Sequence, residues 1–168
     1  LHRRRHSFPT RRSSDLIEAS LSRKLTDVLG DVKVFPDEIP LKYTQDGEAK
    51  PNCTLPAVTY RIVAGDQSDS INRGKTGLCN DTYLVEAFGM KATECQALRR
   101  KLFDEFTGPV DKQWAGRPVR WADGGPKVRW AVASEPSGDT EAATTDAHDV
   151  LRFVQMLLTI TYHKGACP

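Results

Sequence analysis

The chain has 168 residues, of which 39% are hydrophobic and 27% are charged, a composition typical of a single soluble domain with a buried core. The longest apolar stretch, residues 150–160, is interrupted by Arg152 and Gln155, so it falls short of the roughly 18 apolar residues that a membrane-spanning helix needs. The four cysteines form no Cys-x-x-Cys pair, which excludes a zinc finger and a dense disulfide framework, and we expect reduced thiols.

The first sixteen residues differ in character from the rest of the chain. Residues 6–16 read HSFPTRRSSDL, which resembles the translation of a standard short-read sequencing adapter. We therefore expect residues 1–16 to be non-native and disordered, and residues 17–168 to form the single domain. Without residues 1–16, Lys plus Arg falls from 24 to 19 and Asp plus Glu from 22 to 21, so the net charge changes from +2 to about −2. The overall charge then gives no support for nucleic-acid binding.

The first predicted element is a helix. Apolar side chains recur every three or four residues from Ile17 to Leu29, and Gly30 follows as a helix terminator. Residues 32–34 predict a short strand. Residues 35–56 contain four prolines and predict an extended connection that crosses the sheet or contacts a neighbouring molecule.

The next two predicted elements are strands separated by a polar loop. Residues 57–64 and 82–88 alternate in side-chain character and are rich in β-branched and aromatic residues, which is typical of strands. Both sides of the second strand are largely apolar, so we expect it inside a sheet with both faces covered. Residues 66–80 between them predict a long loop of a kind that is commonly functional.

A second helix is predicted directly after this strand, over residues 93–106. Its apolar residues recur at spacings of three and four, Thr93 is placed to cap the first turn, and Gly108 followed by Pro109 ends the helix. The other side of the helix carries charges of both signs, so we expect it to face solvent.

The last third of the chain predicts two more strands and two irregular segments. Residues 108–126 predict irregular or short edge structure, residues 127–134 a strand, residues 135–149 a second long polar loop, and residues 150–163 a final strand. The order helix-strand-strand-helix-strand-strand predicts an α+β fold with an antiparallel or mixed sheet. We expect a mainly antiparallel four-stranded sheet with two helices packed on one face and long inter-strand loops.

No motif in the sequence assembles catalytic, cofactor-binding or metal-binding groups. Gly74-Lys75-Thr76 is similar to the end of a phosphate-binding loop, but Asp69 stands where that loop needs a glycine. His148 lies in a polar predicted loop, and Cys95 lies on the apolar side of the second helix, where a buried structural thiol is expected. We therefore expect no enzymatic activity and no cofactor.

A segment rich in tryptophan and arginine is the main candidate binding surface. These two residue types are enriched at subunit interfaces because they provide large contacts that lose water on binding. They also stack on the bases of single-stranded nucleic acid, which stays an alternative. The candidate subunit-interface residues are Trp114, Arg117, Arg120, Trp121 and Trp130.

Four segments carry a resemblance to a known family. They are IEASLSRKL from Ile17, LPAVTYRIV from Leu55, DTYLVEAFGMKATECQALRRKLFDEF from Asp81, and DVLRFVQMLLTITYH from Asp149. In this order they resemble the tail-completion or tail-terminator proteins of long-tailed bacteriophages and their prophages. The similarity extends from Ile17 to His163.

The resemblance implies a structural virion protein that acts without making or breaking a bond. Such a subunit forms a ring, expected to be a homohexamer, on the end of the tail tube, where it stops tube polymerisation and presents the head-attachment surface. The implied partners are further copies of the chain, the tail tube protein and the head-tail connector protein, with no membrane and with nucleic acid only passing through the lumen. The implied location is the virion tail, and the host cytoplasm during assembly.

The long loop at residues 66–80 is the candidate tube or lumen contact because of its length and polarity, through Asp69, Arg73 and Lys75. One alternative function is a neck or head-completion connector protein, which also forms a ring. The alternative from another class is a small nucleic-acid-binding module, favoured by Arg61, Arg73, Lys75 and the tryptophan- and arginine-rich segment. A monomer with salt-sensitive DNA binding would indicate this last alternative.

Overall fold

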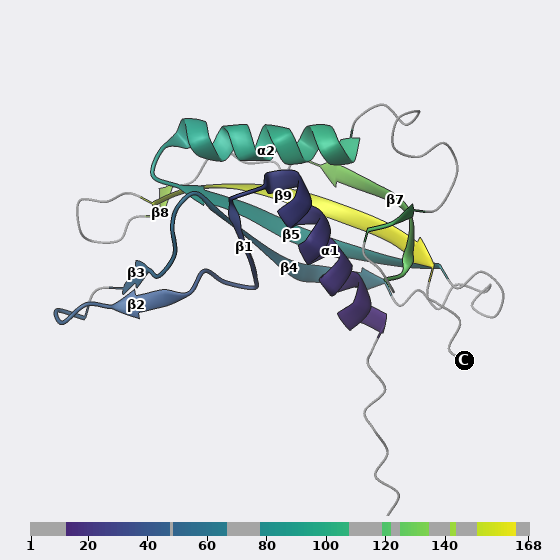
Figure 1. The fold of residues 1–168 in the computed structure, drawn as a ribbon, viewed down its shortest axis with the longest axis horizontal. Coiled ribbons are helices and arrows are strands. Elements are labelled where there is room, and N and C mark those ends of the chain that lie inside the picture. The colour runs from purple at the N-terminus through teal and green to yellow at the C-terminus, as the bar shows by residue number, and fades with distance from the viewer. Residues whose placement is uncertain are drawn as a thin grey trace, which may run out of the picture.

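The computed structural model describes residues 13–47, 49–66, 78–107, 119–121, 125–134, 142–143 and 151–163. Within these ranges the chain has an α+β fold, with two helices, a mixed sheet of five main strands and a separate two-stranded hairpin (Figure 1). The fold class agrees with the prediction from the order of elements.

Two long strands form the middle of the sheet. β5 (Leu78–Gly89) and β9 (Leu151–His163) pair antiparallel along all 12 residues of β5. β4 (Ala57–Asp66) pairs antiparallel with the other side of β5, and β7 (Lys127–Ser134) pairs antiparallel with the other side of β9. The short strands are β1 (Lys33–Pro36) beside β4, β6 (Val119–Arg120) beside β7, and β8 (Ala142–Ala143) beside the start of β9.

The predicted number of four strands is wrong, because β1 adds a fifth main strand. β1 also makes the sheet mixed, which is one of the two sheet types predicted. β1 runs parallel to β4, with Val34 opposite Val58 and Phe35 opposite Thr59. The sequence predicted a short strand at residues 32–34 but did not indicate which strand of the sheet it pairs with. Its hydrogen-bond partners come from a strand that follows only after a long connection, and local periodicity carries no information about such a pairing.

Residues 41–51 form the separate hairpin, which we call the arm. β2 (Leu41–Tyr43) pairs antiparallel with β3 (Ala49–Pro51). Gly47 in the turn has a φ of 82°, and its N–H donates to the carbonyl of Thr44 at 3.0 Å. Figure 1 shows the arm projecting away from the sheet. The extended connection predicted for residues 35–56 therefore contains a hairpin, and it links β1 to β4.

Both helices pack on the same face of the sheet, as predicted. α1 (Ser13–Leu29) and α2 (Ala92–Thr107) contribute to one apolar core with inward-facing residues of β4, β5, β7 and β9. The burial of Leu21 and Leu25 on α1 and of Leu102 on α2 is complete or nearly so. Lys24 of α1 and Glu105 of α2 form an ion pair on the outside. Neither helix combines the length and apolarity that crossing a membrane requires, within the residues described.

One helix end was predicted correctly and one helix start was not. Gly30 follows α1 with a φ of 70°, and its N–H donates to the carbonyl of Thr26 at 2.9 Å, as a glycine terminator should. The predicted cap at Thr93 is wrong, because α2 begins at Ala92 and the first accepting carbonyl belongs to Lys91. Gly89 has no side chain, and a Cβ at this position would lie 3.1 Å from the Cys95 sulfur. Glycine therefore allows the end of β5 and the first turn of α2 to lie close together.

The polar loop predicted for residues 66–80 is shorter than expected. Leu78, Cys79 and Asn80 belong to β5 because they pair with the last residues of β9. Residues 67–77 lie outside the described part of the chain, as do most residues of the irregular segments predicted at 108–126 and 135–149. β6 supplies short edge structure in the first of these segments, and β9 confirms the predicted final strand.

Candidate subunit interface

The sheet face opposite the helices carries a regular ladder of cross-strand pairs, and we call it the second face. Side chains alternate along a strand, so every second residue of β5 and β9 points to this face while the residues between them enter the core. Five pairs of β5 and β9 residues stand opposite each other there: Asn80–Thr161, Thr82–Thr159, Leu84–Leu157, Glu86–Gln155 and Phe88–Phe153.

The polar pairs of this ladder are hydrogen-bonded across the strands. The Thr161 hydroxyl donates to Asn80 Oδ1 at 2.6 Å, and the Gln155 amide donates to Glu86 Oε1 at 2.8 Å. The hydroxyls of Thr82 and Thr159 lie 3.1 Å apart. Each of these polar side chains therefore has one protein partner, which lowers the cost of covering them, although the Glu86 carboxylate keeps a charge that favours water or a cation.

The apolar pairs of the ladder are only half-buried. The Phe88 and Phe153 ring centroids are 5.8 Å apart, and Leu84 stands opposite Leu157. The core-facing residues of β5 are buried, so the prediction of a strand inside the sheet is confirmed, but its second side keeps more exposure than expected. Half-buried leucine and phenylalanine pairs gain free energy when another apolar surface covers them.

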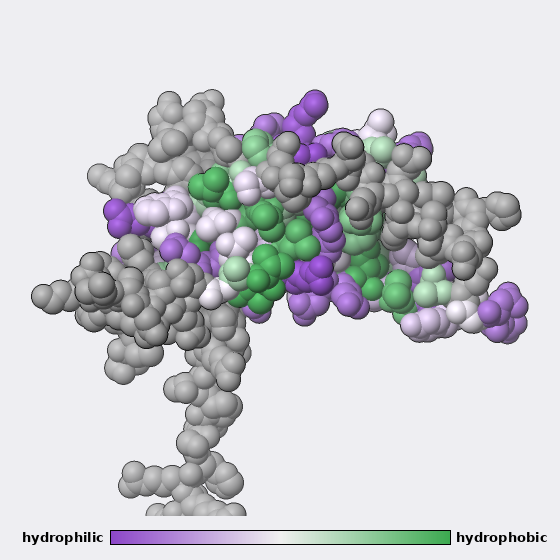
Figure 2. Space-filling view, turned by 180° about the vertical axis from the view of Figure 1, so that it is seen from behind, coloured by the Kyte–Doolittle hydropathy of each residue, from purple (hydrophilic) through white to green (hydrophobic). Residues whose placement is uncertain are grey.

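The second face continues onto β7 with exposed apolar residues. Trp130 is 43% exposed and stands opposite Thr161, and Val132 is 49% exposed and stands opposite Thr159. The Arg129 guanidinium carbon lies 5.3 Å from the centroid of the Trp130 ring, a cation–π contact. Figure 2 views the molecule from the side opposite α1 and shows apolar atoms gathered on this side, crossed by a polar band. Partly exposed apolar surface of this kind marks interaction sites.

The two described tryptophans of the candidate interface lie on opposite faces of the sheet. Trp130 belongs to the second face, whereas Trp121 packs beside the helix-covered core, with its ring centroid 5.7 Å from that of Phe106 in an edge-to-face arrangement. Arg120 lies in β6 opposite Lys127. The structure therefore does not bring Trp121 and Trp130 together on one surface.

The remaining candidate residues lie outside the described part of the chain. These are Trp114 and Arg117 of the proposed interface, and Asp69, Arg73 and Lys75 of the proposed tube or lumen loop. Gly74-Lys75-Thr76 and His148 lie outside it as well. Their assignments stay predictions.

The strongest electrostatic perturbation lies on the helix-covered side, around Asp81. Asp81 is 7% exposed, and its Oδ2 accepts a hydrogen bond of 2.8 Å from the Tyr162 hydroxyl. Burial raises the pKa of the Asp81 carboxyl, and the bond from Tyr162 offsets part of this increase. Burial also raises the pKa of Tyr83 and of Tyr162, and the nearby Asp81 charge raises both further. The Tyr83 hydroxyl oxygen is buried without a hydrogen-bond partner among the described residues.

This group places a carboxyl with a raised pKa inside the fold. Within the described ranges, no three His, Cys, Asp or Glu side chains come together in a way that could hold a metal ion. Cys95 is fully buried, as its place on the apolar side of α2 predicted. The Asp81 group is accordingly a feature of the interior rather than of a binding surface.

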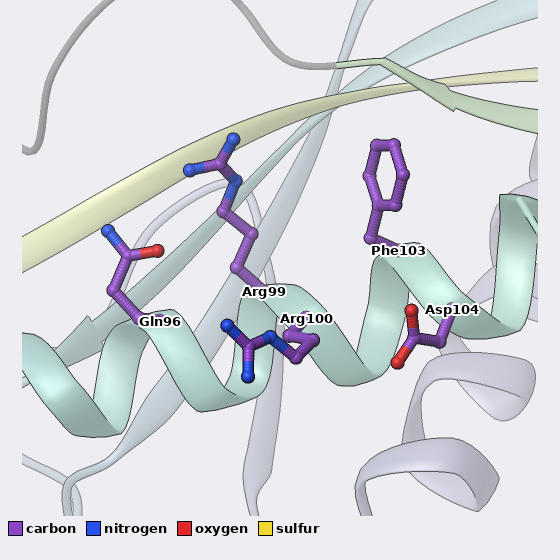
Figure 3. Close-up of a pocket in the computed structure, with 5 residues that line it drawn as sticks. All are labelled: Gln96, Arg99, Arg100, Phe103 and Asp104. Carbon is purple, nitrogen blue, oxygen red and sulfur yellow. The ribbon is translucent and has the colours of Figure 1, made fainter.

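The outer side of α2 contains a depression of about 300 Å³. Its lining consists of Gln96, Arg99, Arg100, Phe103 and Asp104, which all come from this one helix (Figure 3). Arg100 and Asp104 are exposed, in agreement with the predicted solvent-facing side. Among the described residues no second element contributes a group to this depression.

Sequence reasoning missed the arm and the ladder of the second face. Leu41 and Tyr43 alternate with Lys42, and Asp46-Gly47 follows them, which together are a recognisable hairpin signal. Because the segment contains four prolines, an extended connection was predicted there instead of a hairpin. No sequence pattern indicated the ladder, because the register between β5 and β9 decides which residues Asn80, Glu86 and Gln155 pair with.

Comparison of the chain with protein-family models and with curated proteins finds no match. The functional interpretation therefore depends on the surfaces described above and on the resemblance carried by the four sequence segments.

Proposed function

We propose that this chain is a tail-terminator subunit of a long-tailed bacteriophage or prophage, which assembles with copies of itself into a ring on the end of the tail tube. The observation that carries the proposal is the second face. It offers two aromatic rings, two leucines and an exposed tryptophan on one side of a sheet, with its polar groups already hydrogen-bonded to one another. Such a surface suits a lasting contact between subunits.

The arrangement of the resembling segments supports the same function. They coincide with α1, β4, the β5–α2 unit and β9, which build the core and the second face together with β7. In this role the chain needs surface complementarity and rigidity, because it ends a polymer by occupying the polymer's growing end. No bond is made or broken in that process.

Two measurements test the proposal on a chain that begins at Ile17. Light scattering combined with negative-stain electron microscopy should show a closed ring, expected to be hexameric. The ring should also bind the tail tube protein of the same phage or prophage and shorten the tubes that this protein forms. A chain that stays monomeric at every concentration would contradict the proposal.

Two other outcomes would replace this function by one of its alternatives. A ring that ignores tube subunits and binds the portal side would identify a neck or head-completion protein. A monomer that binds single-stranded DNA, with an affinity that falls steeply with salt, would identify a nucleic-acid-binding module. The observation that favours this second alternative is the Arg129–Trp130 contact on the exposed end of the second face.

A further inference from the structure

The two central strands present nearly the same residues to the second face. Three of the five ladder pairs join identical residues, and they are Thr82–Thr159, Leu84–Leu157 and Phe88–Phe153. The other two pairs join polar residues of similar size, Asn80 with Thr161 and Glu86 with Gln155. Each row of the ladder therefore has the same character on β5 as on β9.

A surface with this property is complementary to a second copy of itself. In a two-fold contact both copies use the same patch, so that a residue which contacts another is contacted by that residue's equivalent in return. An axis parallel to β5 and β9, midway between them, places β9 of the second copy over β5 of the first. Leu84 then lies over Leu157 of the second copy, and each row meets a row of its own kind.

The polar rows can also satisfy one another across such a contact. Asn80 uses its side-chain oxygen to accept from Thr161, and its amide nitrogen can still donate. Gln155 donates to Glu86, and an amide nitrogen carries two N–H groups. The two-fold arrangement places the Asn80 amide over the Thr161 hydroxyl of the second copy, and the Gln155 amide over its Glu86 carboxylate. The polar rows would thus gain partners where they lose water.

The size of the second face is adequate for a pair. Five rows spaced two residues apart on four strands cover about 30 Å by 19 Å, or roughly 600 Å² before the relief of the side chains is counted. A standard interface buries roughly 800 Å² on each partner, which is of the same order. On β7 the face includes Trp130 and Val132, which are 43% and 49% exposed. Sheets that pack face to face cross at about 30°, so the rows match best at the middle pair, Leu84–Leu157.

We infer that two copies of the chain pack second face against second face about a two-fold axis parallel to β5 and β9, with β5 of one copy over β9 of the other. This inference goes beyond the proposed function, because a two-fold contact closes at two copies whereas a ring needs a head-to-tail contact. The pair is the form of the chain in the absence of a tube. It covers the apolar rows, and it has to separate before the second face can serve any other contact.

The Glu86 carboxylate opposes this pairing. Its hydrogen bond comes from a neutral amide, so the charge is not compensated, and the two-fold axis brings a second carboxylate into the same row. Like charges that lose water together weaken a contact. The pair is therefore reversible, and the sign of the Glu86 contribution can be measured.

Substitution at the middle row tests the contact itself. Sedimentation velocity of the full 168-residue chain, over a range of concentrations and without tube protein, measures the dissociation constant of the pair. Leu84→Thr should raise this constant by about tenfold or more, because each pair contains the substitution twice. Leu41→Thr is the matched control, since it makes the same change at a leucine of the arm that is 52% exposed, and it should leave the constant as it was.

Substitution of Glu86 should have the opposite effect. Glu86→Gln keeps the size of the side chain and removes the charge, so the dissociation constant should fall below that of the unchanged chain. Added salt should tighten the unchanged pair more than the Glu86→Gln pair, because it screens the two carboxylates. If Leu84→Thr does not fold, Glu86→Gln decides, and weaker pairing of this variant would overturn the inference.

Crosslinking tests the direction of the axis. Ala64 stands opposite Thr82 and Val132 opposite Thr159, so they lie on the two sides of one ladder row. In the inferred pair Ala64 of one copy lies over Val132 of the other. A short bismaleimide, suited to sheets about 10 Å apart, should join Ala64→Cys to Val132→Cys in a mixture of the two variants. Either variant alone should give only the background that the unchanged chain gives through its four cysteines, and a variant that crosslinks to itself above that background would overturn the inferred axis.

The outcomes separate this inference from the proposed function. A chain that passes from monomer to ring without a dimer, or a dimer that Leu84→Thr leaves intact, would overturn the inference and leave the proposed function standing. A dimer that behaves as described but never forms a ring in the presence of tube protein would contradict the proposed function alone. A chain that stays monomeric at every concentration would overturn both.

Discussion

At the scale of single residues, the Asp81–Tyr162 pair is a hydrogen bond between two buried side chains. Asp81 is 7% exposed and Tyr162 is 2% exposed, and the two residues come from β5 and β9. A carboxylate removed from water is destabilised, and a single hydroxyl donor compensates only part of that cost. Burial consequently raises the pKa of Asp81.

Replacing Asp81 by Asn should reduce the pH dependence of stability. In the native chain the pKa of Asp81 exceeds its unfolded value near 3.8, so its contribution to stability is complete at pH values below the unfolded pKa and is lost as the pH rises through the raised native pKa. Asp81→Asn keeps an acceptor for Tyr162 and removes this loss. Its melting temperature should exceed that of the unchanged chain at pH 7, and a gain of about 1 kcal/mol would appear as about 2–4 °C.

Thermal melts between pH 3 and pH 8 would check this difference, with Asp104→Asn as the control. Asp104 is exposed on α2, so the same chemical change there should leave the melting profile as it was. A difference between Asp81→Asn and the unchanged chain that is constant with pH, or that reverses its sign, would show that the carboxyl does not carry the effect.

At the scale of elements, the stability of the fold depends on the apolar sides of α1 and α2 against one face of the sheet. Leu102 of α2 is 1% exposed within a core that includes Leu25 of α1 and Leu158 of β9. The second face contributes less to the isolated subunit, since its leucines and phenylalanines remain half-buried. The helix-covered face thus provides most of the stability of the subunit, whereas the second face keeps apolar surface that is not yet buried.

Leu102→Ala should lower the free energy of unfolding by about 2–5 kcal/mol, because it removes buried methyl groups and leaves a cavity that the surrounding core cannot fill completely. Lys101→Ala, one residue earlier on the exposed side, should change the free energy of unfolding by no more than about 0.5 kcal/mol. Urea denaturation followed by circular dichroism measures both. Equal effects of the two substitutions would contradict the described orientation of α2.

At the scale of the whole molecule, the contribution of the first sixteen residues can be separated from the domain. α1 begins at Ser13, four residues earlier than predicted, and Ile17, whose burial is the first described, is fully buried. The core therefore receives its first described contact at the predicted start of the domain. The expectation that residues 1–16 are non-native stays a prediction.

Deletion of residues 1–16 should lower the free energy of unfolding by less than about 1 kcal/mol, since it removes the first turn of α1 and none of the residues described in the core. It should also change the net charge from +2 to about −2, which isoelectric focusing would detect as a change from a basic to an acidic protein. Unfolding of the shortened chain, or loss of its assembly, would show that these residues belong to the functional domain.

The sequence was sufficient for features that depend on local periodicity. The apolar residues of α1 and α2 repeat every three or four positions, and those of β4, β5 and β7 repeat every second position, so the type of each element followed from its own residues. The placement of both helices on one face agrees with the prediction made from the order of the elements. The glycine that ends α1 is equally local, since it needs only a positive φ.

The tertiary structure decided everything that joins distant residues. It placed β1 parallel to β4, separated the arm from the sheet, and assigned Trp121 and Trp130 to opposite faces. The pairs Asp81–Tyr162 and Asn80–Thr161 each join residues 81 positions apart. A local pattern records which side of a strand is apolar, whereas the register between strands selects the residues that meet across it. The candidate interface is a product of that register.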